Sequence, residues 1–346
     1  MNKRHYIIPI FISHIGCPHQ CVFCNQDKIA KEVEEEEVTA QDVKNTIEDY
    51  LKTIDHNNST VEVSFFGGTF TAINVNKQKE LLSVAKEYKD NGLIDKIRMS
   101  TRPDAINRYI LSYLKEYKVD VIELGVQSLD DEILKLSGRG HTANDVKEAS
   151  KLIKEYKFTL GHQIMPGLPG DNFEKDIETA SKSIEMKPDI CRIYPALVIK
   201  DTPMELMYKR GEYKPYSLDE AVNISKELYK LYNKANVNII RIGLQPTENI
   251  TWGGDLVDGP FHPAFRELVE GSLICDKIKS QINEDEDIII EVNSKDLSKL
   301  YANKKIYFND LKDNHKGKII VNTKDKLKRG KISIIVVKRT KEISIG

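Results

Sequence analysis

The sequence predicts an α/β fold, a partial (βα)6 parallel barrel with a small C-terminal α+β appendage. Three observations favour it. Short apolar runs alternate with helical patterns, glycine or polar residues follow the apolar runs, and hydrophobic residues make up 40% of the 346 residues, enough for a sizeable core. Strands that alternate with helices of this length form right-handed βαβ units, so the strands should lie parallel.

The barrel elements follow in order along the chain. The first apolar run, 6–13, ends before a cysteine-containing loop, and the acidic stretch 32–37 is expected to be a solvated loop. Thr39 is expected to cap a helix over 40–53. Further strands are expected at 61–66, 96–100, 119–124, 158–164 and 190–194, with helices at 77–88, 106–117, 130–136, 143–156 and 172–186. Six strands are too few for a closed eight-stranded barrel, so an open one is predicted.

The pattern changes after residue 196. A helix is expected over 218–235 and a strand over 238–242, before a loop-rich stretch, 243–271, that we expect to be functional. The appendage is predicted from elements at 287–292, 297–300, 318–321 and 332–337. We therefore expect a core domain over 1–245 and a C-terminal substrate-binding or accessory region over 246–346.

Charge is unevenly distributed along the chain. The total is 52 Lys and Arg against 53 Asp and Glu, but from Leu300 onward it is 13 against 4, a net of +9 that leaves −10 for the first 299 residues. The basic end is compatible with an RNA partner or with a solvated lysine surface. Because no apolar run is long enough to cross a membrane and the start lacks an export signal, we expect a cytoplasmic protein.

Three of the five cysteines form the pattern CxxxCxxC at Cys17, Cys21 and Cys24. Three thiolates can bind three irons of a 4Fe-4S cluster and leave the fourth iron open to another molecule. Zinc is the alternative, and it would need His14 or His19 as a fourth ligand. The remaining cysteines, Cys191 and Cys275, stand alone and are expected in the core.

Further candidate positions follow predicted strand ends, which meet at one edge of a parallel sheet. They are Gly67-Gly68-Thr69, Ser100, Gln127, Met165 and Tyr194, and Gly138-Arg139-Gly140-His141 opens the next helical segment. Glycines allow the backbone to approach a ligand closely.

The cysteine loop after the first strand, together with these motifs, resembles the radical S-adenosylmethionine (SAM) superfamily. The resemblance implies a 4Fe-4S cluster on Cys17, Cys21 and Cys24 whose open iron binds SAM. An electron from the cluster would cleave SAM to a 5'-deoxyadenosyl radical that abstracts hydrogen from a substrate, while the protein places the reactants. An electron donor such as flavodoxin or ferredoxin is then expected.

By this resemblance the SAM-binding residues are Phe23, Gly67, Gly68, Thr69, Ser100, Gln127 and Arg139. Phe23 is expected near the adenine, with core packing as the alternative. Gln127 and Arg139 are expected to reach the ribose and the carboxylate, for which a guanidinium is well suited. At Ser100 the relatives carry an acid, and a hydroxyl can bond a ribose but cannot neutralise a cation.

Four blocks, 123–128, 139–142, 162–169 and 192–200, resemble the catalytic subunit of Elongator, which modifies wobble uridines of tRNA. Two of these motifs also resemble oxygen-independent coproporphyrinogen III oxidases. Modification of a tRNA base is therefore the expected function, with radical chemistry on a small porphyrinogen-like or metabolite substrate as the alternative and a nonenzymatic iron or zinc protein as a third. The length after residue 245 is expected to be too short for the acetyltransferase domain of the Elongator family.

Candidate catalytic residues are Tyr194 and Lys200, at the end of the last barrel strand. Their alternatives are a packed aromatic ring and a surface lysine. Gln245, Trp252 and His262, in the loop-rich stretch, are further candidates for facing the substrate.

Overall fold

The computed structural model describes residues 4–12, 17, 19–25, 38–55, 58–247 and 249–337. The chain divides into two compact units, Met1–Pro263 and Ala264–Gly346, which are described separately below. The boundary expected at residue 245 lies inside the first unit, and the division into a core and an accessory region stays a prediction.

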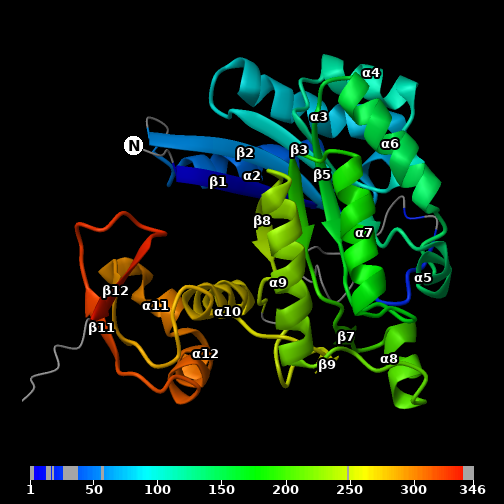
Figure 1. The fold of residues 1–346 in the computed structure, drawn as a ribbon. Helices are drawn as coiled ribbons and strands as arrows, with labels where there is room; N and C mark the ends of the chain where they lie inside the picture. Colours follow the sequence, from blue (N-terminus) through cyan, green and yellow to red (C-terminus); the bar gives the residue numbers. More distant parts are fainter. Residues whose placement is uncertain are drawn as a thin grey trace, which may run out of the picture. The chain divides into compact units, whose positions relative to one another are not determined.

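The first unit is built on a seven-stranded parallel sheet that curls into a half-barrel (Figure 1). In spatial order its strands are β1 (Arg4–Ile12), β2 (Ser59–Gly67), β3 (Lys96–Thr101), β4 (Val121–Gln127), β5 (Thr159–Ile164), β6 (Ile190–Ile193) and β8 (Asn238–Ile242). The predicted partial barrel is thus confirmed. A seventh strand joins it because helix α9 returns the chain to the sheet edge, so that β8 pairs parallel to β6.

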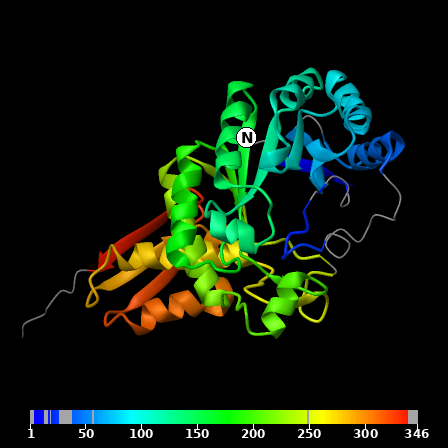
Figure 2. The same cartoon turned by 90° about the vertical axis from the view of Figure 1, so that its right-hand side faces the viewer.

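Helices line the outer side of this sheet (Figures 1 and 2). They are α2 (Ala40–Leu51), α3 (Val75–Asp90), α4 (Arg108–Glu116), α5 (Asp131–Leu136), α6 (Ala143–Glu155), α7 (Phe173–Glu185) and α9 (Leu218–Lys234), with 3-10 turns η2 (Phe70–Ala72) and η3 (Pro103–Ala105) between them. Val63, Ile97 and Ile122 are fully buried strand residues of the core. Thr39 caps α2 as predicted, because its hydroxyl accepts from the Asp42 amide.

A small antiparallel pair, β7 (Val198–Ile199) and β9 (Leu256–Asp258), follows the barrel, with α8 (Pro203–Lys209) between them in sequence. Ile199, Ile250, Leu256 and Phe261 form a separate apolar cluster there. This cluster keeps much of the stretch after residue 245 within the first unit. The stretch is also shorter than the predicted 243–271, because a helix begins at Phe265.

The second unit packs helices on a three-stranded mixed sheet, which agrees with the predicted α+β appendage. Its elements are α10 (Phe265–Lys279), β10 (Asp287–Val292), η4 (Ser294–Asp296), α11 (Leu297–Leu300), α12 (Ala302–Asp313), β11 (Ile319–Thr323) and β12 (Ile332–Val337). Central β10 pairs parallel to β11 and antiparallel to β12. Ile288, Ile290, Phe308 and Cys275 are in its core. Helices α10 and α12 were not predicted.

Parallel strands joined by helical crossovers place all their carboxyl ends at one edge of the sheet. The residues after β1, β2, β3, β4 and β6 therefore converge there, although they lie far apart in sequence. Within the part of the chain that is described, no helix is long and apolar enough to cross a membrane.

Candidate functional site

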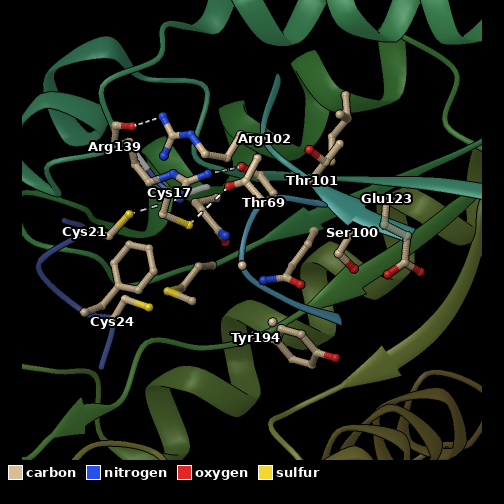
Figure 3. A pocket seen from close by; sticks show the side chains of 18 of the residues that line it. Cys17, Cys21, Cys24, Thr69, Ser100, Thr101, Arg102, Glu123, Arg139 and Tyr194 are labelled. Carbon is tan, nitrogen blue, oxygen red and sulfur yellow. Dashed lines mark hydrogen bonds between the residues drawn. The ribbon is translucent and has the colours of Figure 1, made fainter. Parts of the chain in front are cut away.

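A cavity of about 680 Å³ opens at the carboxyl ends of the barrel strands (Figure 3). It gathers the three cysteines of the loop, all of the predicted SAM-binding residues, and Met165 and Tyr194. Those that line it are Cys17, Cys21, Phe23, Cys24, Gly67, Gly68, Thr69, Ser100, Gln127, Arg139, Met165 and Tyr194. These residues come from the cysteine loop and from the ends of five different strands, except Arg139, which follows α5.

The cysteine loop is held by backbone hydrogen bonds to later parts of the chain. The Val22 amide donates to the Ser137 carbonyl at 3.0 Å, and the Val22 carbonyl accepts from the Met204 amide at 2.8 Å. Phe23 packs against the apolar cluster of Ile133, Leu168 and Ala196 and also lines the cavity, while its expected position near the adenine stays a prediction. The loop is thereby attached to the end of α5 and to α8.

The sulfurs of Cys17 and Cys21 contact hydrogen-bonding side chains. Cys17 Sγ lies 3.2 Å from Thr69 Oγ1, and Arg139 Nη1 donates to Cys21 Sγ at 3.2 Å (Figure 3). Among the described residues no three His, Cys, Asp or Glu side chains are arranged to hold a metal ion. The sulfurs share one cavity, and their grouping around a cluster stays a prediction.

The glycine pair brings the ends of β1 and β2 together. Gly67 has φ +105°, and a Cβ there would lie 2.3 Å from the Ile12 carbonyl oxygen, so a side chain is excluded. The Gly68 amide donates to the same oxygen at 2.7 Å. The Gly68 amide is therefore used within the fold, where it joins the end of β2 to the end of β1, the strand that leads into the cysteine loop.

Gln127 and Arg139 carry polar atoms without partners. Gln127 is 6% exposed and has φ +65°, and its Oε1 bonds to no other described atom. A left-handed non-glycine residue with an unsatisfied buried oxygen is costly, and such strain is typical of functional sites. Arg139 donates to the Gly125 carbonyl at 2.5 Å, its Nε is unpaired, and no carboxylate within the described residues neutralises it. This corner of the cavity is suited to an anionic, polar ligand.

Arg102 holds the backbone of Arg139 in place, a role that the sequence analysis missed. It is 4% exposed, donates two hydrogen bonds to Asp104 at 2.9 and 2.8 Å, and also donates to the backbone carbonyl of Arg139. Burial acts to raise the pKa of Asp104, but the hydrogen bonds and the charge of Arg102 outweigh it and lower this pKa. The sequence Arg102-Pro103-Asp104 could have indicated this role, because a guanidinium two residues before a carboxylate can pair with it.

A chain of charged side chains crosses the interior of the barrel and reaches the cavity, which Glu123 and Tyr194 line. Arg98 bonds Glu62 at 3.0 Å and also Glu123, Arg192 Nε lies 3.0 Å from Glu123 Oε2, and Arg192 Nη1 donates to the Tyr194 hydroxyl at 2.9 Å. Burial acts to raise the pKa of Glu62, but hydrogen bonding and Arg98 outweigh it and lower this pKa to about 2. The two arginines and two glutamates balance, so the wall that ends in Tyr194 is polar without net charge.

Several other candidates do not line the cavity. Lys200 is exposed and donates to the Gly254 carbonyl. Gln245 accepts from Arg241 at 2.8 Å, and Trp252 is 55% exposed. His262 is also outside the lining, and His14 lies outside the described residues.

Two family models match the chain. The radical SAM superfamily matches residues 11–182 and the radical SAM C-terminal domain matches residues 188–274. A tRNA uridine(34) acetyltransferase of Methanocaldococcus infernus is 29% identical over 255 residues, covering 63% of this chain and 48% of that protein. Elongator complex protein 3 of Homo sapiens is 29% identical over 201 residues, covering 52% of this chain and 37% of that protein. The chain thus spans about half the length, or less, of these relatives.

Other similar proteins agree on the fold. An uncharacterized protein of Methanocaldococcus jannaschii is 30% identical over 237 residues, covering 65% of this chain and 70% of that protein. The structure of an archaeal Elp3 from Methanocaldococcus infernus, with N-terminal residues 1–46 deleted, superposes with a TM-score of 0.61 at 24% identity, covering 82% of this chain and 65% of that one. Since the matched models span the half-barrel and the cavity at its strand ends, this chain belongs to the radical SAM superfamily, whose enzymes use a 4Fe-4S cluster and SAM.

Proposed function

We propose that this radical SAM enzyme modifies a tRNA base, with the cluster on Cys17, Cys21 and Cys24. The observation that carries the proposal is the cavity itself. It collects three thiols, an uncompensated guanidinium and an unpartnered amide oxygen at the strand ends of a half-barrel. The named relatives that act on tRNA uridine support the choice of substrate class.

The donor set fits the cluster and SAM. Three thiolates leave one iron of a 4Fe-4S cluster open for SAM, and the hydrogen bonds from Arg139 and Thr69 suit charged sulfur. The unpaired Arg139 charge fits the SAM carboxylate, and the unpartnered Gln127 oxygen fits a ribose hydroxyl. When bound, the cluster and SAM would supply reductive cleavage of the sulfonium and abstraction of hydrogen from the substrate.

The residues of this chain would then position the reactants and exclude water. Phe23, Met165 and Leu168 form an apolar wall beside the cysteine loop, which limits access of solvent to the sulfurs. Arg102 holds the Arg139 backbone and so fixes where the Arg139 guanidinium can reach. Neither task requires a proton transfer.

The substrate would lie against the opposite wall of the cavity. Ser100, which is also one of the predicted SAM contacts, and Gln163 line this wall, and neither side chain forms a hydrogen bond with another described residue. Tyr194 offers a phenol held by Arg192. An amide, a hydroxyl and a phenol can recognise the edge of a neutral planar base. Because Arg98 and Arg192 are already paired with glutamates, this wall is poorly suited to a porphyrinogen with several carboxylates. Tyr194 is accordingly proposed as a substrate contact, while Lys200 stays a prediction outside the cavity.

The test is anaerobic reconstitution with iron and sulfide, followed by SAM, dithionite and unfractionated tRNA. We expect 5'-deoxyadenosine release that rises when tRNA is added, and no rise with a porphyrinogen. The variant Cys17→Ala/Cys21→Ala/Cys24→Ala should lose both bound iron and SAM cleavage. Cys191→Ala/Cys275→Ala is the matched control, because both residues are buried away from the cavity, and it should retain iron.

Each arm has an outcome that decides the proposal. A rise with porphyrinogen and none with tRNA would overturn the substrate class and favour the small-molecule alternative. Iron retained by the triple variant would overturn the cluster assignment. Flavodoxin or ferredoxin can replace dithionite in a further arm, where faster SAM cleavage would support a protein electron donor.

A further inference from the structure

The second unit carries a basic loop that is held in one conformation by buried polar groups. The loop joins β11 to β12 over residues 324–331 (Figure 1) and contains five Lys or Arg and one Asp. Asn293 is 7% exposed, and its Nδ2 donates to the carbonyls of Asp325 at 3.1 Å and Leu327 at 2.9 Å. The loop backbone is thus ordered by the turn that follows β10.

Further contacts at the same turn fix the other end of the loop. Asp296 is 6% exposed and accepts from the Gly330 amide at 2.7 Å and from the Arg329 side chain at 3.3 Å. The Ser294 hydroxyl donates to the Asp325 carboxylate at 2.5 Å. Asp325, the one acidic residue in 324–331, therefore already has a hydrogen-bond partner. These contacts use Arg329 and Asp325 for structure, and Lys324 pairs with Glu291, so that the remaining lysines of the loop are exposed.

The exposed cations that remain on this loop and on the turn that orders it are here called the basic edge: Lys295, Lys326, Lys328 and Lys331. None of them forms an ion pair with another described residue, whereas Lys324 of the same loop lies 2.7 Å from Glu291. The turn and the loop that carry these four ammonium groups are already ordered, so little backbone conformational freedom is lost when an anion binds. The basic edge is therefore pre-organised for a polyanion.

We propose that the basic edge binds the phosphate backbone of RNA and so anchors the substrate of the proposed function, on which this inference rests. Lysine ammonium groups interact with phosphates as point charges, and counterions are released from the nucleic acid when the lysines bind it. An acidic protein is a poorer match, because protein interfaces centre on aromatic or aliphatic anchors and the basic edge consists of lysines alone. The first 299 residues carry a net charge of −10, so the chain as a whole does not attract phosphates. The attraction has to come from the basic edge itself.

The test compares two full-length triple variants in binding to unfractionated tRNA over a range of salt concentrations. Lys326→Gln/Lys328→Gln/Lys331→Gln removes three charges from the basic edge. The control Lys277→Gln/Lys279→Gln/Lys312→Gln removes three exposed charges from helices α10 and α12 of the same unit. We expect the first variant to bind about tenfold or more weakly, with a salt slope reduced by about 2 to 3, because each lost phosphate contact removes about 0.9.

Basal SAM cleavage without RNA and the thermal unfolding midpoint should be unchanged in both variants, since neither contains a cavity residue. Equal tRNA affinity and salt slope for the two triple variants would overturn the proposal. So would slower reduction by flavodoxin with unchanged tRNA binding, which would assign the basic edge to an acidic protein. Absence of tRNA binding by the unmodified chain would instead count against the proposed function itself.

Discussion

Replacing Gln127 by glycine should make the ligand-free protein at least as stable while weakening SAM binding. Gln127 lies at a bulge near the end of β4, with φ +65° and an amide oxygen that bonds to no described atom. Neither feature benefits the ligand-free fold. Both make sense if the side chain is held ready for a ligand.

The expected magnitude follows from four contributions. Glycine relieves about 1–2 kcal/mol of left-handed strain and removes an unsatisfied buried oxygen that costs about 1–3 kcal/mol. Against this, two buried methylenes are lost at about 0.8 kcal/mol each, and glycine adds about 0.5–1 kcal/mol of chain entropy. The net change in the free energy of unfolding is a gain of about 1 kcal/mol, where truncation of a buried side chain ordinarily destabilises.

Urea unfolding of the ligand-free protein and titration of the reconstituted protein with SAM measure the two effects. Lys157→Gly is the matched control, because Lys157 is exposed, has φ +60° and lies outside the cavity. The control should change stability slightly and SAM affinity not at all, whereas Gln127→Gly should weaken SAM binding about tenfold. A loss of more than about 1 kcal/mol relative to the control, or unchanged SAM affinity, would refute the reasoning.

Three further predictions concern the interior of the barrel and the cysteine loop. Glu123→Gln should lower the free energy of unfolding by about 3–5 kcal/mol, because Glu123 is the one carboxylate that pairs with Arg192 among the described residues, and Glu123→Gln/Arg192→Gln should regain most of it; equal urea midpoints for the two variants would contradict this. Gly140→Ala should reduce the iron bound after reconstitution, because a Cβ there lies 2.3 Å from the His19 ring at φ +73°; an iron assay decides, and a full iron content would exclude this steric role. Burial lowers the pKa of His162 to about 3, so the unfolded chain takes up its proton first and stability should fall as the pH drops from about 6.5 toward 3. His162→Asn should flatten this decline in urea midpoints measured across that pH range, and an unchanged slope would show that other groups cause it.

Much of the architecture could be predicted because it depends on local pattern. Alternating strands and helices, with polar residues after each strand, determine a parallel sheet and place the strand ends at one edge. The cysteine spacing and the Gly67-Gly68 pair could be recognised in the same way, and the cavity brings them together. Helices α10 and α12 escaped prediction because their apolar residues face a separate core that local periodicity reveals only weakly.

The contacts that give the cavity its chemistry could not be predicted, because they join residues far apart in sequence. Arg139 meets Cys21 across 118 positions, and Arg98 meets Glu123 across 25. Strand register decides which charged side chains face the interior together, and a shift of one residue would turn each of them to the other face. The amino-acid sequence alone therefore determined the elements and their order, whereas the tertiary structure decided which side chains neutralise one another and which, like the Gln127 oxygen, are left for a ligand.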